Sequence, residues 1–195
     1  MRFKFLLQFL RHPRSIGAVV PSSRGLARRM VADIDLSDAS VVVEYGPGTG
    51  ALTGEILKAL KPGALFFAIE SNAILFESFR QRFPDVTVFN ESAANVAALL
   101  EGLGAEKADC VLSGLPWASF TATLQDTLLE ATLEALGDGG RFVTFAYLQG
   151  LLLPSGQSFK RKLQQRFGHV GRSSIAWANL PPAFVYRCVK RSNGA

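Results

Sequence analysis

The sequence lacks the features that define several classes of protein. Its 195 residues include only 2 cysteines, Cys110 and Cys188, too few for a disulfide framework or a zinc site, so we expect both to be reduced packing residues. No apolar run reaches the roughly 18 residues that span a bilayer, because Gln149 and Gly150 interrupt the richest stretch. Polar residues from Lys4 onward also interrupt any signal-peptide core. We therefore expect a cytoplasmic protein without a metal.

Acidic residues are absent from both ends of the chain. Residues 1–32 carry seven basic side chains and residues 139–195 carry nine, with no acid in either range, so all 16 acids lie between them. The net charge of +5 therefore divides into +7, −11 and +9. With 48% hydrophobic and 19% charged residues, the chain is not disordered, and its length fits one domain. A polyanion is a suitable partner for the two ends.

The first 35 residues read as two helices. Residues 1–11 have large apolar side chains at the spacing of one helical face, and Pro13 should end that helix. The segment Pro21-Ser22-Ser23 predicts the start of a second helix, from about Ser23 to Ile34. We therefore treat residues 1–35 as an N-terminal helical extension and residues 36–195 as the main domain.

From residue 40 onward, strand and helix patterns alternate. The β-branched run Val41-Val42-Val43 is typical of a central parallel strand, and Asp138-Gly139-Gly140 reads as a turn. The predicted strands are 41–43, 65–69, 86–89, 108–112, 141–147, 169–177 and 184–190, and the predicted helices are 51–60, 72–83, 93–102, 121–136 and 157–167. This order predicts an α/β, Rossmann-like, doubly wound sheet of seven mostly parallel strands. Such a sheet binds ligands at the carboxyl ends of its strands.

A glycine-rich loop follows the first strand, in the segment Glu44-Tyr45-Gly46-Pro47-Gly48-Thr49-Gly50. The glycines permit a tight turn, and the helix behind them offers free N–H groups. Dinucleotide sites use a similar loop, but Glu44 would repel a pyrophosphate and could pair with an ammonium group. Glu70, which ends the second strand, can accept hydrogen bonds from ribose hydroxyls. S-adenosylmethionine carries both an ammonium group and a ribose.

Residues 40–147 thereby resemble the core of a class I S-adenosylmethionine-dependent methyltransferase. The resemblance implies that the cofactor contacts Glu44, Gly46, Gly48, Thr49, Gly50, Glu70, Ser71 and Ser113. In this family an acid after the third strand contacts the adenine, and here the local sequence is Asn90-Glu91-Ser92-Ala93. Either Ser92 or Glu91 would make that contact, beside Ala93.

Three further segments resemble the bacterial phospholipid N-methyltransferases, which convert phosphatidylethanolamine toward phosphatidylcholine. They are Pro13 to Ser23, Ser113-Gly114-Leu115-Pro116 and Asn179 to Ala183. The resemblance implies that Ser22 and Ser23 approach the cofactor and that residues 113–116 face the transferred methyl group. Independently, the basic and amphipathic N-terminal segment suits contact with an anionic bilayer, so we expect residues 1–35 to contact the inner membrane surface and cover the active site. We expect a monomer. Where this family has an aliphatic residue, the chain has Trp117.

The same residues leave other functions open. Adenine N6-methyltransferases of nucleic acid, including the related ribosomal RNA dimethyltransferases, place an Asn where this chain has Gly114, so the hydrogen bond that orients an adenine amino group is missing. Trp117 can stack on a base, cap an apolar chain or pack under a turn. A small-molecule methyltransferase or a silent binding module remains a third alternative. A lipid ammonium group must lose a proton before it attacks, and Tyr147, at the end of a strand, is our candidate for orienting the amine. Both histidines, His12 and His169, are expected to be structural.

Overall fold

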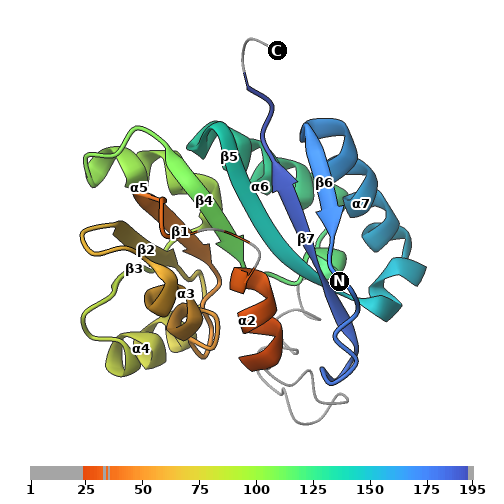
Figure 1. The fold of residues 1–195 in the computed structure, drawn as a ribbon, viewed down its shortest axis with the longest axis horizontal. Helices are drawn as coiled ribbons and strands as arrows, with labels where there is room; N and C mark the ends of the chain where they lie inside the picture. Colours follow the sequence, from red (N-terminus) through yellow and green to blue (C-terminus); the bar gives the residue numbers. More distant parts are fainter. Residues whose placement is uncertain (1–23, 33, 35, 193–195) are drawn as a thin grey trace.

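A seven-stranded sheet forms the centre of the protein (Figure 1). The structure, a computed structural model, describes residues 24–32, 34 and 36–192, so the helix predicted over residues 1–11 lies outside the described residues. The strand order is β3-β2-β1-β4-β5-β7-β6. Strands β3 to β5 pair in parallel, whereas β7 pairs antiparallel with both β5 and β6. The strands are β1 Val41–Tyr45, β2 Leu65–Ile69, β3 Thr87–Phe89, β4 Ala108–Ser113, β5 Leu136–Tyr147, β6 His169–Arg172 and β7 Ala183–Val189.

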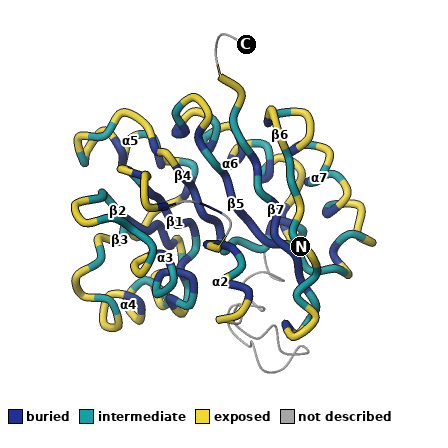
Figure 2. The backbone as a smooth tube through the Cα atoms, in the orientation of Figure 1, coloured by how far each residue is buried: buried dark blue, intermediate teal, exposed yellow. Residues whose placement is uncertain are grey.

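Helices cover both faces of this sheet, which confirms the doubly wound α/β fold. The helices are α2 Arg24–Ala32, α3 Thr53–Ala59, α4 Ala73–Arg82, α5 Val96–Gly102, α6 Ala122–Ala135 and α7 Pro154–Arg166, with short 3-10 turns η1 Ala93–Asn95, η2 Trp117–Ser119 and η3 Leu148–Leu152. Buried residues of α5, α6 and α7 form one core with the sheet, and those of α2 and α3 form a second core with its other face. Figure 2 shows the buried strands between helices with exposed outer sides.

Three boundaries differ clearly from the sequence prediction. The strand predicted over residues 169–177 ends at Arg172, because beyond it Ala176 forms only an isolated bridge to Ala183. Asp138, Gly139 and Gly140, predicted as a turn, lie within β5, whose register with β4 shifts between Ala108 and Cys110. Gly139 has a φ of +70°, so the turn residues are accommodated as an irregularity inside the strand. Helix α7 begins at Pro154 rather than near residue 157, because proline lacks an N–H and suits the first turn of a helix.

Two basic side chains of the C-terminal range form ion pairs inside the fold. Lys162 and Arg166 on α7 contact the carboxylate of Asp126 on α6 at 2.7 and 2.6 Å. The side chain of Lys162 is only 13% exposed. These two positive charges therefore join α6 to α7 and are not free for an external polyanion. Both Cys110 and Cys188 are buried free thiols, as predicted.

The described residues contain no helix long and apolar enough to cross a membrane.

Candidate active site

The glycine-rich loop leaves β1 at the carboxyl edge of the sheet, as predicted. Its backbone is fixed by the N–H of Gly46, which donates to the carbonyl of Ile69 at 2.9 Å. Gly46 and Gly50 have φ values of +65° and +77°, a region that side chains disfavour. A Cβ on Gly46 would lie 2.7 Å from Leu115, and one on Gly50 would overlap the ring of Phe83. The loop therefore requires glycine both for its turn and for the close approach of its neighbours.

Glu44 places a carboxyl group in the core directly beneath this loop. The residue is fully buried, and Thr53 donates its hydroxyl hydrogen to Oε2 at 2.7 Å. The other oxygen, Oε1, has no hydrogen-bond partner among the described residues. Burial raises the pKa of Glu44 to about 8, so this carboxyl is mostly protonated at pH 7 in the ligand-free protein. An unpartnered buried carboxyl oxygen at a strand tip fits an ammonium group, which would favour the ionised form.

Glu70 connects the tip of β2 to the same loop. Its Oε1 accepts from the backbone N–H of Asn72 at 2.9 Å, and its Oε2 accepts from that of Gly48 at 3.3 Å. Burial nevertheless raises the pKa of Glu70, because loss of solvent outweighs these two bonds. The carboxyl lies beside the glycine loop, as a contact to ribose hydroxyls requires.

The segment after β3 is held by its own local hydrogen bonds. Glu91 is exposed, and its carboxylate accepts from the backbone of Ser92 and the amide of Asn95. The hydroxyl of Ser92 accepts from the N–H of Ala94 at 3.2 Å and caps η1. Both candidates for the adenine contact thus lie in one turn, and buried Ala93 anchors it. Ser71 and Thr49 are exposed at the same edge of the sheet, whereas Ser22 and Ser23 lie outside the described residues.

The segment after β4 packs against the glycine loop. Gly114 donates its N–H to the carbonyl of Tyr45 at 2.8 Å, and a Cβ on Gly114 would lie 2.7 Å from the carbonyl oxygen of Gly46. Any side chain at position 114, including the Asn of adenine N6-methyltransferases, would therefore need the backbone to move. The absence of a side chain here follows from packing. Leu115 fills the space above Gly46, and Pro116 leads into η2.

Trp117 packs under the turn, one of the three roles that the sequence left open. The residue is 2% exposed, its ring stacks on Phe159 with centroids 4.7 Å apart, and its indole N–H donates to the hydroxyl of Ser113 at 3.0 Å. Ser113 is fully buried and also accepts from the N–H of Leu115 at 3.3 Å. Since the indole is enclosed, it cannot stack on a base. Its function is to hold residues 113–116 in place.

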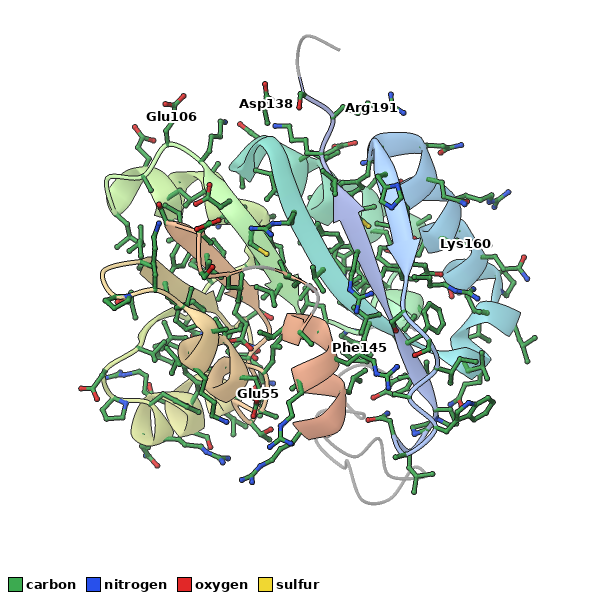
Figure 3. All side chains as sticks on the ribbon, viewed as in Figure 1. Glu55, Glu106, Asp138, Phe145, Lys160 and Arg191 are labelled. Atoms are coloured by element: carbon green, nitrogen blue, oxygen red, sulfur yellow. The ribbon has the colours of Figure 1, made fainter. Side chains whose placement is uncertain are left out.

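Tyr147 ends β5 at the same edge of the sheet. Its ring meets Phe145 edge to face at 5.3 Å, and burial raises its pKa to about 12. The phenol therefore stays protonated at neutral pH and can orient an amine by a hydrogen bond but cannot serve as its base. His169 begins β6 at the opposite edge of the sheet. In Figure 3, Glu106 and Asp138 mark that opposite edge and Phe145 lies toward the site.

Four residues that support the site were missed by the sequence reasoning. Thr53 follows the glycine loop and binds Glu44, and its position in the first turn of a helix was the available signal. Asn90 donates its amide to the carbonyl of Glu70 at 2.8 Å. Arg82 donates to the carbonyl of Thr49 at 3.0 Å, next to the ring of Phe83 beneath Gly50. Arg82 and Phe83 lie more than thirty residues from the glycine loop in the sequence, so no local pattern indicates them.

Comparison with curated proteins gives a match over nearly the whole chain. The chain is 32% identical over 189 residues to an ornithine lipid N-methyltransferase of Singulisphaera acidiphila, covering 95% of this chain and 94% of the relative. It is 29% identical over 111 residues to ribosomal RNA small subunit methyltransferase A of Chlorobium phaeobacteroides, covering 57% of this chain but 40% of that protein. No protein-family model matches.

Among solved structures, the N-methyltransferase NodS of Bradyrhizobium japonicum in complex with S-adenosylhomocysteine has a TM-score of 0.71 to this chain. The two are 14% identical, and the alignment covers 94% of this chain and 97% of NodS. At this identity the likeness concerns the fold, which agrees with the order of strands described above.

Replacing Glu44 by Gln should affect cofactor affinity and thermal stability in opposite directions. We expect Glu44→Gln to lower the affinity for S-adenosylmethionine by at least about tenfold, because an amide cannot form an ion pair with the ammonium group. The raised pKa means that ionisation of Glu44 destabilises the ligand-free fold as pH rises from 4.5 to about 8. The variant should therefore match or exceed the wild-type melting temperature above pH 8.

Calorimetric titration and thermal unfolding at several pH values measure these two effects. Glu77→Gln, which removes an exposed carboxylate on α4, is the matched control and should change neither. Unchanged affinity in Glu44→Gln would show that Glu44 does not bind the cofactor.

Proposed function

This chain belongs to the family of S-adenosylmethionine-dependent methyltransferases that includes the ornithine lipid N-methyltransferase, and from this premise we propose that it methylates the amine of a membrane lipid. S-adenosylmethionine is its cofactor. The observation that carries the proposal is the match of 95% of the chain to a lipid N-methyltransferase, since the ribosomal RNA methyltransferase above matches over only 40% of its own length. We propose phosphatidylethanolamine as the substrate. The headgroup of an ornithine lipid, which also carries an amine, is the second candidate.

The cofactor site that we propose uses buried acids on two adjacent strands. Bound S-adenosylmethionine supplies an electrophilic methyl group on a sulfonium, so the protein has mainly to position the reactants and exclude water. Glu44 would hold the ammonium group through Oε1, and Glu70 would accept from the ribose while keeping Gly48 in place. Ser92 or Glu91 would lie at the adenine. The glycine loop lets the backbone approach closely.

The acceptor side suits an aliphatic amine better than a nucleobase. Residues 113–116 would face the methyl group, and Gly114 contributes no side chain that could orient a planar amino group. Trp117 is enclosed, so no described aromatic of this segment is available to stack on a base. An aliphatic amine needs neither contact, because its nitrogen lone pair can be directed by a single hydrogen bond. This packing supports the lipid over the nucleic acid.

Tyr147 is the residue that we propose for this hydrogen bond. Its phenol stays neutral because its pKa is raised to about 12, so the oxygen can accept from an N–H of the neutral amine and aim the lone pair. The proton of the ammonium form leaves before this step, to solvent or another acceptor. Tyr147 would therefore orient the amine once it has lost its proton, without acting as the base.

The place of action that we propose is the anionic inner surface of the membrane, where the protein binds peripherally as a monomer. The acid-free N-terminal range, residues 1–32, supports this, since basic side chains next to anionic headgroups favour binding. Residues 1–35 would contact the membrane and cover the active site. In this arrangement the lipid reaches the cofactor without leaving the bilayer.

Transfer of labelled methyl groups tests the substrate class. Vesicles of phosphatidylethanolamine and phosphatidylglycerol, vesicles with an ornithine lipid, and ribosomal RNA are incubated separately with labelled S-adenosylmethionine. We expect label in a lipid amine and none in RNA, and Glu44→Gln should lower the incorporation at subsaturating S-adenosylmethionine. Label in RNA alone would overturn the lipid assignment.

Tyr147→Phe tests the orienting hydrogen bond. Loss of one such bond should lower kcat by about tenfold while leaving the affinity for S-adenosylmethionine unchanged. The pH profile of kcat, measured beside wild type, checks that the amine is affected. If the variant kept full turnover with an ordinary pH profile, Tyr147 would have no such role.

A further inference from the structure

Of the six large apolar side chains that are exposed in the described part of the chain, Leu57 and Ile74 lie on α3 and α4, and the other four lie in two short segments beside the candidate active site. Leu152 and Leu153 are 81% and 49% exposed, and Trp177 and Leu180 are 67% and 70% exposed. The first pair lies where η3 meets α7, and the second pair lies in the loop 173–182 between β6 and β7. Water-exposed side chains of this size in one region mark a contact surface.

Both segments leave the sheet at its carboxyl edge, the edge of the glycine loop. Tyr147 at the end of β5 pairs with Ala183 at the start of β7, so the chain before Ala183 lies beside the chain after Tyr147. The N–H of Leu148 donates to the carbonyl of Pro182 at 2.8 Å and joins the two segments directly. The exposed surface therefore borders the residue that we propose to orient the amine.

The loop 173–182 is fixed in shape, although its tip is exposed. Ala176 donates its N–H to the carbonyl of Ala183 at 2.7 Å, and the amide of buried Asn179 donates to the carbonyl of Pro181 at 2.6 Å. These bonds hold Trp177 and Leu180 outward on a rigid support. An apolar tip held in this way loses little conformational entropy when it is buried.

Basic side chains surround the base of this loop. A pocket of about 500 Å³ lies between α2 and the β6–β7 segment, lined by Arg28, Arg29, Ala32, Arg172, Ser173, Ser174 and Arg187. The guanidinium of Arg29 donates to the carbonyl of Ser174 at 3.0 Å, which ties α2 to the loop. The side chain of Arg28 is 68% exposed, and its Nε lies 3.6 Å from a carboxylate oxygen of Glu55 on α3. Neither apolar segment contains a charged residue, and no acid occurs after residue 138.

We propose that loop 173–182 and residues 148–153 form a docking surface for an anionic lipid bilayer. Trp177 and Leu180 enter the interface between headgroups and acyl chains, and the arginine-lined pocket faces the anionic headgroups. The combination of an exposed tryptophan, aliphatic side chains and a pocket lined by four arginines, of which Arg28 pairs with Glu55, fits this partner. The inference rests on the proposed function and extends it, since it adds a membrane contact within residues 148–182. This surface borders Tyr147, which we propose to orient the amine.

Tryptophan fluorescence reports this contact at a single residue. The chain has two tryptophans, and Trp117 is enclosed in the core, so a change on adding vesicles reports Trp177. With vesicles of phosphatidylglycerol and phosphatidylethanolamine, we expect a blue shift and quenching by brominated acyl chains. Trp177→Phe should remove both. If the protein sediments with vesicles while Trp177 emission stays unshifted and unquenched, the proposed surface is wrong.

Vesicle affinity gives a second measurement. The double variant Trp177→Ser/Leu180→Ser should bind anionic vesicles at least about tenfold more weakly, because two large apolar groups no longer leave water. Leu57→Ser, which changes an exposed leucine on α3, is the matched control and should bind as wild type does. Arg28→Gln should weaken binding by about fivefold to anionic vesicles and leave binding to neutral vesicles unchanged. Unchanged affinity for S-adenosylmethionine verifies that each variant is folded.

The outcomes separate this inference from the proposed function. Vesicle binding through Trp177 without methylation of any lipid would refute the function and leave the docking surface standing. Methylation of vesicle lipid with wild-type binding by the double variant would refute the surface alone. If the double variant lost a concentration-dependent dimer but kept its vesicle affinity, the surface would belong to a second copy of the chain and the inference would be wrong.

Discussion

The proposed cofactor site depends on one constraint, the carboxyl group of Glu44, which is enclosed in the core near the end of β1. Because the pKa of Glu44 is raised to about 8, keeping this carboxyl protonated in the core at pH 7 lowers the stability of the ligand-free fold by about 3 kcal/mol. Thr53 donates a hydrogen bond to Oε2, and no described residue donates one to Oε1. Such a group weakens a ligand-free protein, and a cation at Oε1 would offset that cost. We propose that this unsatisfied carboxyl is kept because it binds the cofactor.

Close packing around the glycine loop links cofactor and acceptor. Gly46 lies under Leu115, and its carbonyl oxygen leaves no space for a side chain at position 114. If this loop binds the cofactor, as we propose, the same packing also determines which groups face the acceptor. An enzyme for adenine would need an Asn at this point and a different backbone. The proposed lipid acceptor and the proposed cofactor site thus both depend on the packing around Gly46.

Much of the fold could be predicted because strand and helix periodicities are local. Glu44, Glu70 and the glycines were also predictable, since their spacing relative to strand ends fixes their place at one edge. The enclosure of Trp117 and the approach of Phe83 to Gly50 depend on contacts between distant segments, which periodicity does not encode. The pairing of Lys162 and Arg166 with Asp126 likewise removed two charges from a basic end that had seemed free.

The central claim is that Glu44 is a buried, largely neutral carboxyl that ionises against the cationic cofactor. Carboxyl-resolved NMR titration of the wild-type protein measures its pKa directly, with and without S-adenosylmethionine. We expect the ligand-free pKa to lie near the value of about 8 that burial produces, and to fall when the cofactor binds. An ordinary pKa near 4.5 in the ligand-free protein, or one that does not move on binding, would contradict the account.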